Sequence, residues 1–378
     1  MADIEFMDIS AATITEKLIT GVEDRLSVPL YPGDERRLLL EALAPAIVQI
    51  INEADDNCKQ RLLAYARNDV LDALGDRMNT SRLQASPAKT VLRFSVAEKR
   101  DRSTFIPQGT RATADGSAHF ATMAAVTIPA GALYVDVAAE CTTPGAAFNG
   151  YSVGAISTIT DLIPYVAGVT NIEASHDGDD GEPMDSGGDG DNRYRERIRL
   201  APAKLSTAGP EASYIYHALS ASPLITDVKP LNDHDAGTVE LIIMTEDGSP
   251  SEDIIEAVQN ACNDISVRPL NDLVIVNGPE RVQYDINIKY YTTAENEQAT
   301  VAAIENAGGA LDKFNEWQQQ KIGRDINPDK LRAFCLAPTD GTGALRMEIT
   351  APVFTSLTER QLAKFSGILT VTHEVTEE

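Results

Sequence analysis

Residues 34–54 read DERRLLLEALAPAIVQIINEA and carry the strongest helical pattern in the chain. Asp34 and Glu35 suit a helix N-terminus, because acidic side chains there cap free backbone N–H groups and oppose the helix dipole. Apolar residues then recur every three or four positions, which places them on one helical face. They are Leu39, Leu43, Ile47, Ile50 and Ala54, followed by Leu62, Tyr65, Val70 and Leu74. The pattern predicts a helical region over residues 34–80, which Pro45 should kink or break.

This apolar stripe has two interpretations. The helices pack on their own domain, or they join a bundle with helices of other chains. Few other helices are predicted nearby in the sequence, which favours the bundle. The residues expected at such a partner interface are Leu39, Leu43, Ile47, Ile50, Leu62 and Tyr65.

The regions beside this helical stretch have different patterns. Residues 1–33 predict an N-terminal arm with one short helix. Residues 88–175 alternate apolar and polar side chains between frequent Gly and Pro residues, which is typical of a β-rich module. Residues 176–192 contain seven acidic residues, five glycines and no Lys or Arg. Such a composition predicts an acidic, flexible loop that cannot fold alone.

The rest of the chain predicts two α+β units, over residues 193–280 and 281–378. In each, helices cover one face of an antiparallel sheet. The second unit is expected to contain one helix over residues 294–321. Four arginines open the first unit, and we interpret them as a solvated helix neutralised by the acidic loop: Arg193, Arg195, Arg197 and Arg199. The fold class predicted is therefore α+β and multidomain, with long N-terminal amphipathic helices and a small all-β module.

Composition excludes several classes of function. The 378 residues include 57 acidic and 32 basic residues, a formal net charge of −25. A nucleic-acid binder needs clustered Lys and Arg, and an anionic membrane surface would repel this chain. The start has no basic or apolar signal segment, and residues 38–51 are too short and polar to span a bilayer. The four cysteines form no CxxC pair, so neither a metal knuckle nor a disulfide framework is predicted.

Catalytic and metal sites find no support in the sequence. A calcium-loop template fits Asp185, Asp189, Gly190 and Glu196, but Gly187 occupies a ligand position and the preceding helix is missing. His217 follows Ser213 by one helical turn without an acid to orient it. His234, between two aspartates, fits a polar turn. We therefore assign no catalytic, cofactor-binding or metal-binding residue and expect a protein that is not an enzyme.

An ordered series of short motifs resembles the baseplate J-like family, the baseplate wedge proteins of contractile phage tails, R-type bacteriocins and related contractile injection systems. The series runs from residue 35 to the C-terminal strands, and its block at 205–214 is the most specific. It comprises LDALG at 71–75, IPQGTR at 106–111, FAT at 120–122, RYRERI at 193–198, LSTAGPEASY at 205–214, HALSAS at 217–222 and ITDV at 225–228.

The resemblance implies a structural role without cofactors. A family member pairs with itself and with a second baseplate wedge protein, and wedges surround the central hub and spike beside the sheath initiator. The ring changes from a closed to an open form when the sheath contracts. Such a subunit is made and assembled in the bacterial host cytoplasm and then becomes part of the virion or tail-like particle.

Two other functions stay open. A tail-tip adhesin or glycan-binding module would suit the β-rich module, but needs an exposed aromatic cluster. A hydrolase of peptidoglycan would need a pair of carboxylates as its catalytic groups, and no spacing in the sequence indicates such a pair.

Overall fold

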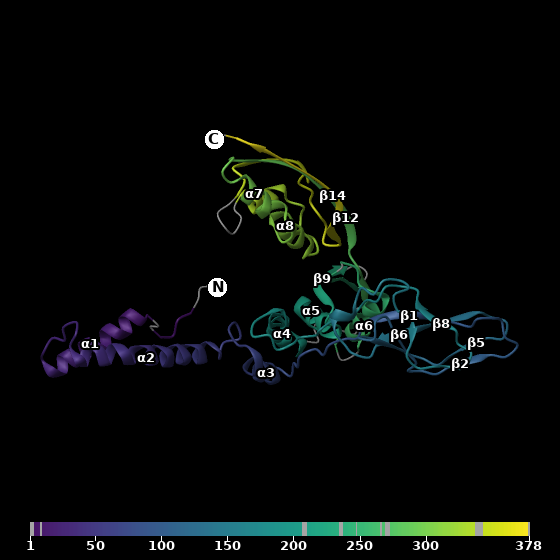
Figure 1. Ribbon diagram of the computed structural model, residues 1–378, viewed down its shortest axis with the longest axis horizontal. Coiled ribbons are helices and arrows are strands. Elements are labelled where there is room, and N and C mark those ends of the chain that lie inside the picture. Colours follow the sequence, from purple (N-terminus) through teal and green to yellow (C-terminus); the bar gives the residue numbers. More distant parts are fainter. Residues whose placement is uncertain are drawn as a thin grey trace. The chain divides into compact units, whose positions relative to one another are not determined.

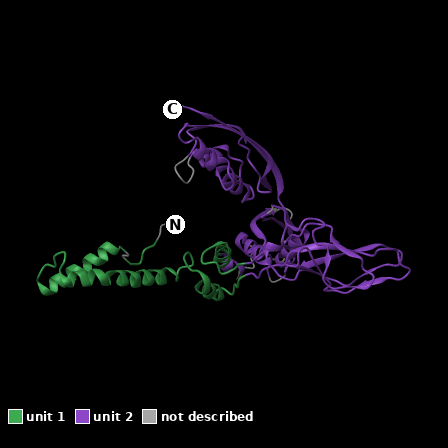
Figure 2. Ribbon diagram, in the orientation of Figure 1, with its two compact units in different colours: residues 1–82, 182–199 green, residues 83–181, 200–378 purple. Residues whose placement is uncertain are grey.

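The computed structural model describes residues 4–7, 10–205, 210–233, 237–246, 248–264, 267–268, 273–336 and 343–376. The fold is α+β and multidomain, as predicted from the sequence. Contacts divide the chain into two compact units (Figure 2). Unit 1 comprises residues 1–82 and 182–199, and unit 2 comprises residues 83–181 and 200–378.

Unit 1 begins with a helical hairpin of α1 (Ala11–Leu26) and α2 (Glu35–Lys59), visible at the purple end of the chain in Figure 1. Ser10 caps α1 by accepting a hydrogen bond from the Thr13 backbone N–H, and Asp34 caps α2 through the Arg36 N–H. The side chains buried along the hairpin include Ile14 and Ile19 of α1 and Ala44 of α2. Two shorter helices, α3 (Asn68–Arg77) and α4 (Asp189–Leu200), follow.

Helix α2 passes through Pro45 without ending, although the sequence predicts a kink or a break there. Proline at 45 removes only one backbone donor, the one that would reach the Glu41 carbonyl. Glu41 and Pro45 are both exposed. Water can therefore satisfy the unused carbonyl, while neighbouring turns of α2 pack on α1.

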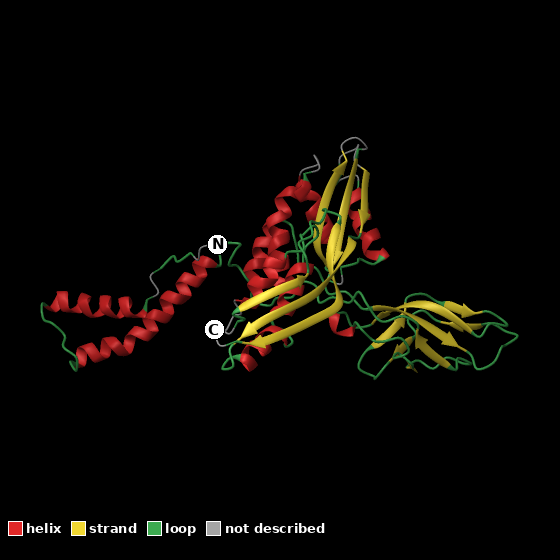
Figure 3. Ribbon diagram, turned by 90° about the horizontal axis from the view of Figure 1, so that it is seen from above, coloured by secondary structure: helices red, strands yellow, loops and turns green. Residues whose placement is uncertain are grey.

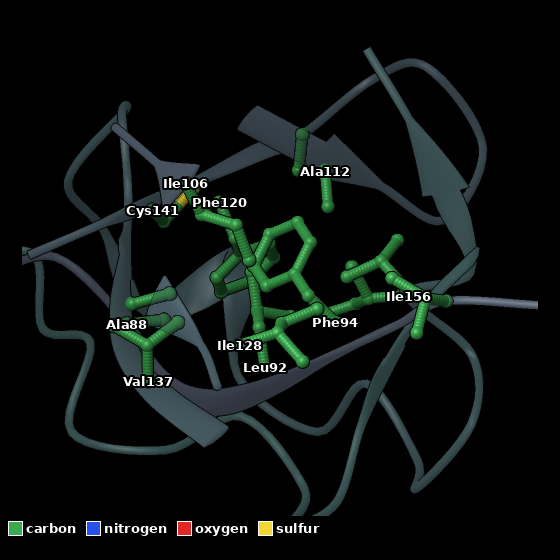
Figure 4. Close-up of a cluster of buried hydrophobic side chains, with 14 residues drawn as sticks. Ala88, Leu92, Phe94, Ile106, Ala112, Phe120, Ile128, Val137, Cys141 and Ile156 are labelled. Atoms are coloured by element: carbon green, nitrogen blue, oxygen red, sulfur yellow. The ribbon is translucent and has the colours of Figure 1, made fainter. Parts of the chain in front are cut away.

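The β-rich module forms the first part of unit 2. Its six-stranded sheet has the order β7-β3-β4-β6-β1-β8, and the end strands β7 and β8 contact each other, so the sheet nearly closes into a barrel. The strands are β1 (Lys89–Ser95), β3 (Arg111–Thr113), β4 (His119–Thr122), β6 (Tyr134–Cys141), β7 (Thr158–Ile159) and β8 (Gly168–Asn171). A separate antiparallel pair joins β2 (Thr104–Ile106) to β5 (Val126–Ile128). Figure 4 shows the side chains that fill the interior, with Phe94 and Phe120 fully buried.

A central α+β part follows a short 3-10 helix at Ala201–Leu205. Its sheet has the order β11-β10-β9, and helices α5 and α6 supply the side chains that pack on it. The elements are α5 (Glu211–Ala221), β9 (Ile225–Asp233), β10 (Thr238–Thr245), α6 (Glu252–Asn263) and β11 (Leu273–Asn277). The β9–β10 pair is antiparallel as expected, whereas β10 and β11 are parallel, which the sequence pattern does not predict.

The C-terminal α+β part has a sheet of order β13-β12-β14 with helices against its concave face (Figures 1 and 3). The elements are β12 (Glu280–Thr292), α7 (Glu297–Glu305), α8 (Ala310–Gln319), α9 (Pro328–Leu336), β13 (Arg346–Ala351) and β14 (Gln361–Val375). Again one pair is antiparallel, β12–β13, and one is parallel, β12–β14.

The single helix expected over residues 294–321 is wrong, because the chain forms α7 and α8 instead. Gly308 lies between them with a φ of +76°, a left-handed conformation that glycine adopts without steric cost. The adjacent glycines at 308 and 309 therefore interrupt the helix.

Candidate assembly interface

Three of the residues predicted at a partner interface form an exposed apolar stripe on α2. The exposed fractions are 60% for Leu39, 49% for Leu43 and 64% for Ile50. At 3.6 residues per turn, these three side chains lie within about 40° of one another around the helix axis. Ala44, which is buried, lies about 140° from Leu39 on the same basis. The stripe therefore faces away from the buried side of the hairpin.

The other three predicted interface residues do not belong to this stripe. Ile47 is half-buried on α2. Leu62 and Tyr65 lie beyond the end of α2, in turns that lead to α3, and both are half-buried. The Tyr65 hydroxyl also accepts a hydrogen bond from the Ile4 backbone N–H at 3.0 Å. The structure thus brings together Leu39, Leu43 and Ile50, and separates Leu62 and Tyr65 from them.

Asp55 holds the N-terminal segment against α2. Its carboxylate is buried and accepts hydrogen bonds from the backbone N–H groups of Phe6 at 2.8 Å and Met7 at 3.0 Å. It also pairs with Lys59 at 3.1 Å. Burial raises the pKa of Asp55, but Lys59 and the two backbone donors outweigh this effect and hold the pKa below its usual value. No pattern in the sequence marks Asp55, because an acidic residue on an amphipathic helix is usually solvated.

The acidic stretch before α4 acts as its cap. Asp185 accepts hydrogen bonds from the backbone N–H groups of Gly190 at 2.8 Å and Asp191 at 3.0 Å. Burial raises the pKa of Asp185, but these backbone donors outweigh burial and hold the pKa below its usual value. Helix N-termini favour such carboxylates. Helix capping therefore accounts for Asp185, one of the residues that match the calcium template.

A group of charged side chains joins α4 to α3; we name Asp72, Arg82, Glu182, Asp191 and Arg197 the charge clasp. The side chain of Asp72 is 30% exposed and those of the other four are at most 10% exposed. Arg197 pairs with Glu182 at 2.6 Å, and Arg82 pairs with both Asp72 and Asp191 at 2.6 Å. Asp191 is fully buried. Low-dielectric surroundings strengthen such pairs, and each charge depends on its partner.

Contacts with uncharged partners complete this packing. The Tyr194 hydroxyl donates to the Thr80 carbonyl at 2.6 Å, and its ring lies under the Arg82 guanidinium at 4.7 Å. Arg195 donates to the carbonyls of Leu63 at 2.8 Å and Ala66 at 2.7 Å. Arg197 pairs with Glu182 of the acidic stretch, whereas Arg195 binds backbone carbonyls and Arg199 pairs with Glu196. Arg195 and Arg197 therefore anchor α4 rather than being only solvated.

The stretch 176–192, predicted to be flexible, makes defined bonds at both ends. Ser86 and Asp179 exchange backbone hydrogen bonds at 2.8 and 3.1 Å in unit 2. Glu182 and Asp191 are buried in the charge clasp of unit 1. Any flexibility of this stretch would have to break these bonds, and it stays a prediction.

Within the ranges described, no cluster of three His, Cys, Asp or Glu residues has a metal-binding arrangement. His217 is half-buried, and burial, with a smaller contribution from Lys204, lowers the pKa of its imidazole. His234 lies outside the described residues, as do residues 206–209 of the 205–214 motif. No helix within these described ranges combines the length and the apolarity needed to cross a bilayer.

Two family models match the chain. The baseplate J-like protein barrel domain matches residues 91–178, and the baseplate J-like central domain matches residues 206–278. These ranges correspond to the nearly closed barrel and to the central α+β part. The chain thus contains two domains of the baseplate J-like type.

This baseplate J-like chain is 32% identical over 166 residues to baseplate protein J of Escherichia phage P2. The match covers 43% of the chain and 52% of the relative, so it spans about half the relative's length. The chain also resembles one chain of the cryo-EM structure of the anti-feeding prophage baseplate. That likeness has a TM-score of 0.44 and 10% identity, over 94% of this chain and 89% of the other, which is too weak to support an inference.

Proposed function

We propose that this baseplate J-like chain is a non-enzymatic structural subunit of a contractile-tail baseplate. It forms part of a wedge around the central hub and spike, beside the sheath initiator. It is assembled in the bacterial host cytoplasm and then carried in the tail. The family domains over residues 91–178 and 206–278, and the relative named baseplate protein J, support this proposal.

The observation that carries the assembly role is the exposed stripe of Leu39, Leu43 and Ile50 on α2. The steps of four and seven residues between them are those of the core positions of a helical bundle. Large apolar side chains gain about 25 cal/mol per Å² of apolar surface removed from water. Partner helices from a second copy and from a second wedge protein would supply that burial. The half-buried Ile47, Leu62 and Tyr65 would flank this bundle.

The closed-to-open change of the ring belongs to the same proposal. Buried ion pairs in the charge clasp favour movement of α3 and α4 together, because separating them would leave charges unpaired in the interior. Flexibility between parts of the chain would then be concentrated outside the clasp.

Co-expression with a candidate second wedge protein, followed by light-scattering mass measurement, tests the proposal. We expect a complex of fixed stoichiometry. A chain that stays an inert monomer in the presence of its tail proteins would contradict a structural assembly role.

A glycan-binding role has one observation in its favour. Tyr134 and Tyr165 are exposed on the barrel, with exposed fractions of 51% and 68%. However, the guanidinium of Arg93 lies 4.2 Å from the Tyr134 ring centroid, and that of Arg100 lies 3.5 Å from the Tyr165 centroid. One face of each ring is thereby covered, which leaves less surface for stacking a sugar. Binding of a polysaccharide that Tyr134→Ala and Tyr165→Ala abolish would revive this alternative.

A further inference from the structure

The loop between β7 and β8, residues 160–167, holds Tyr165 in an unfavourable backbone conformation; we name it the barrel loop. The Val166 backbone N–H donates to the Ile163 carbonyl at 3.3 Å, which closes a turn with Pro164 and Tyr165 at its centre. Tyr165 has a φ of +71°, a left-handed conformation that suits glycine far better than a bulky residue. Its side chain is 68% exposed, so burial in the barrel does not explain why tyrosine occupies this position.

The barrel loop is fixed firmly to the barrel beneath it. Ile163 and Val166 pack against the barrel core. Asp161 accepts hydrogen bonds from the backbone and guanidinium of Arg111 at 2.8–3.0 Å. Leu162, between these anchors, is 93% exposed. The loop is therefore a rigid support that presents apolar side chains to the outside.

A cation accompanies Tyr165. The Arg100 guanidinium lies 3.5 Å from the Tyr165 ring centroid, and it donates to the Thr104 hydroxyl at 2.8 Å. An aromatic ring, a phenolic hydroxyl and a positive charge are thus presented together. Tyrosine and arginine are enriched among the residues that contribute most to binding at protein interfaces.

Helix α2 contains a second exposed residue that is locally unfavourable, Pro45. Proline is the least favourable residue in a helix interior, and the carbonyl of Glu41 loses its helical donor because Pro45 has no N–H. Pro45 lies in a groove of about 470 Å³ between α1 and α2, which we name the hairpin groove. Its apolar lining includes Ala11, Ala44, Pro45 and Val48, and its acidic lining is Glu41 and Glu53.

The hairpin groove and the exposed stripe lie on different sides of α2. At 3.6 residues per turn, Ala44 and Val48 lie about 140° and 180° from Leu39 of the stripe. A partner in the groove therefore leaves the stripe open for the helices of the proposed bundle. The volume of the groove falls in the range of about 300–1,000 Å³ that is usual for binding pockets.

The groove and the barrel loop have complementary chemistry. The groove offers an apolar floor with a proline ring, a backbone carbonyl without its helical donor, and carboxylates at its rim. The loop offers an aromatic ring, a hydroxyl that can donate and a guanidinium. Opposite charges determine which groups meet across an interface. Each surface also contains a residue that its own fold disfavours, as is expected where function competes with local stability.

We propose that the barrel loop of one copy of this chain docks in the hairpin groove of a second copy. The Tyr165 ring packs on Pro45, its hydroxyl donates to the Glu41 carbonyl, and Arg100 approaches the carboxylate of Glu53. The contact joins two different surfaces, so it can continue from copy to copy around a closed ring. This inference rests on the proposed function, in which copies of the chain are neighbours in one baseplate.

Two substitutions test the contact without harming the fold. Tyr165→Gly removes the ring and places glycine where the backbone is left-handed, so the melting temperature should not fall by more than a few degrees. Pro45→Ala restores a backbone donor to the Glu41 carbonyl and should raise the melting temperature. A purely structural role of either residue would instead make its variant less stable.

Binding between copies is measured by immobilising one full-length variant and titrating another over it. Tyr165→Gly against itself lacks the loop contact, and Pro45→Ala against itself lacks the groove contact. We expect both to bind at least about tenfold more weakly than wild type against wild type, as for residues that dominate an interface. Pro45→Ala over immobilised Tyr165→Gly retains one intact loop and one intact groove. This mixed pair should bind with close to wild-type affinity.

Tyr134→Ala is the matched control. Tyr134 is also an exposed barrel tyrosine, with the Arg93 guanidinium 4.2 Å from its ring centroid, but it lies on β6 and not in the barrel loop. This variant should bind as wild type does. The contact would be overturned if wild-type copies did not bind one another up to about 1 mM. Equal weakening by Tyr134→Ala, or a mixed pair no stronger than the two self pairs, would overturn it as well.

Failure of this contact can be told apart from failure of the proposed function, because the hairpin groove and the stripe face different ways. The contact fails alone if both variants bind their own copies as wild type does while the complex with the second wedge protein still forms. The proposed function fails alone if that complex is absent while the mixed pair of variants binds.

Discussion

Arg197 and Glu182 form an ion pair at 2.6 Å in which only 7% and 1% of the two side chains are exposed. The pair connects α4 to the acidic stretch that precedes it, so both ends of this stretch are held. A buried charge that loses its partner is costly, because the interior cannot replace the solvation that the charge had in water.

Removal of one partner from this pair should therefore destabilise unit 1. We expect Glu182→Ala to lower the free energy of unfolding by roughly 3–5 kcal/mol, measured by chemical denaturation. Arg199→Ala on the same helix is the control, since the Arg199–Glu196 pair is exposed and worth less than about 1 kcal/mol. Equal effects of the two substitutions would show that burial does not determine the strength of the Arg197–Glu182 pair.

Gly75 lies where α3 meets Tyr194. A Cβ atom at Gly75 would lie 1.9 Å from the Tyr194 hydroxyl oxygen and 2.7 Å from the Thr80 carbonyl oxygen. Gly75→Ala should displace Tyr194 and destabilise the protein by roughly 1–3 kcal/mol in thermal unfolding. Gly21→Ala should instead stabilise α1 by up to about 1 kcal/mol, because a Cβ at Gly21 meets open space. A stabilising Gly75→Ala would contradict the packing of α4 on α3.

The exposed stripe on α2 should matter for assembly and not for folding of the free chain. We expect Leu43→Glu to leave the melting temperature within a few degrees, because Leu43 is already 49% exposed. The same substitution should abolish co-purification with the second wedge protein. Leu38→Glu is the matched control: Leu38 is 53% exposed but lies about 140° from Leu43 around the helix. Equal loss of binding in both variants would rule out a specific stripe.

Acid should release the N-terminal segment. The folded pKa of Asp55 is lowered, so the stability it contributes is present above its unfolded pKa of about 3.9 and is lost as pH falls through the folded pKa. The Phe6 and Met7 amide resonances should move toward their unbonded positions below about pH 4. Asp55→Asn removes this titration. Persistence of the same acid transition in Asp55→Asn would assign it to another group.

The order of helical, β-rich and α+β regions follows from local periodicity, and so could be predicted. Asp34 caps α2, residues 91–96 overlap β1, and residues 282–291 lie within β12. The break between α7 and α8 also has a local signal, the adjacent glycines at 308 and 309. The prediction of one helix over residues 294–321 gives more weight to the long helical pattern around these glycines.

Long-range contacts explain what the sequence pattern misses. Tyr194 and Thr80 are 114 positions apart, and no local rule links them. Parallel pairing of β12 with β14 depends on the three helices between them rather than on either strand alone. The helical period correctly groups Leu39, Leu43 and Ile50 of the candidate interface. The same period continues past Lys59, where α2 ends, because the turn there contains ordinary helix-forming residues. The sequence pattern therefore adds Leu62 and Tyr65 to the same face.

The isolated backbone bridge between Ser86 and Asp179 has a further consequence. The chain enters and leaves the barrel at adjacent points, and the barrel has a hydrophobic core of its own. A module whose two ends are adjacent can be inserted or deleted without separating the parts of the chain that flank it. Deletion of residues 87–178 should therefore leave two chain ends close enough to be joined, although it would remove the Lys89–Asp253 ion pair and the Ser251–Asp177 hydrogen bond.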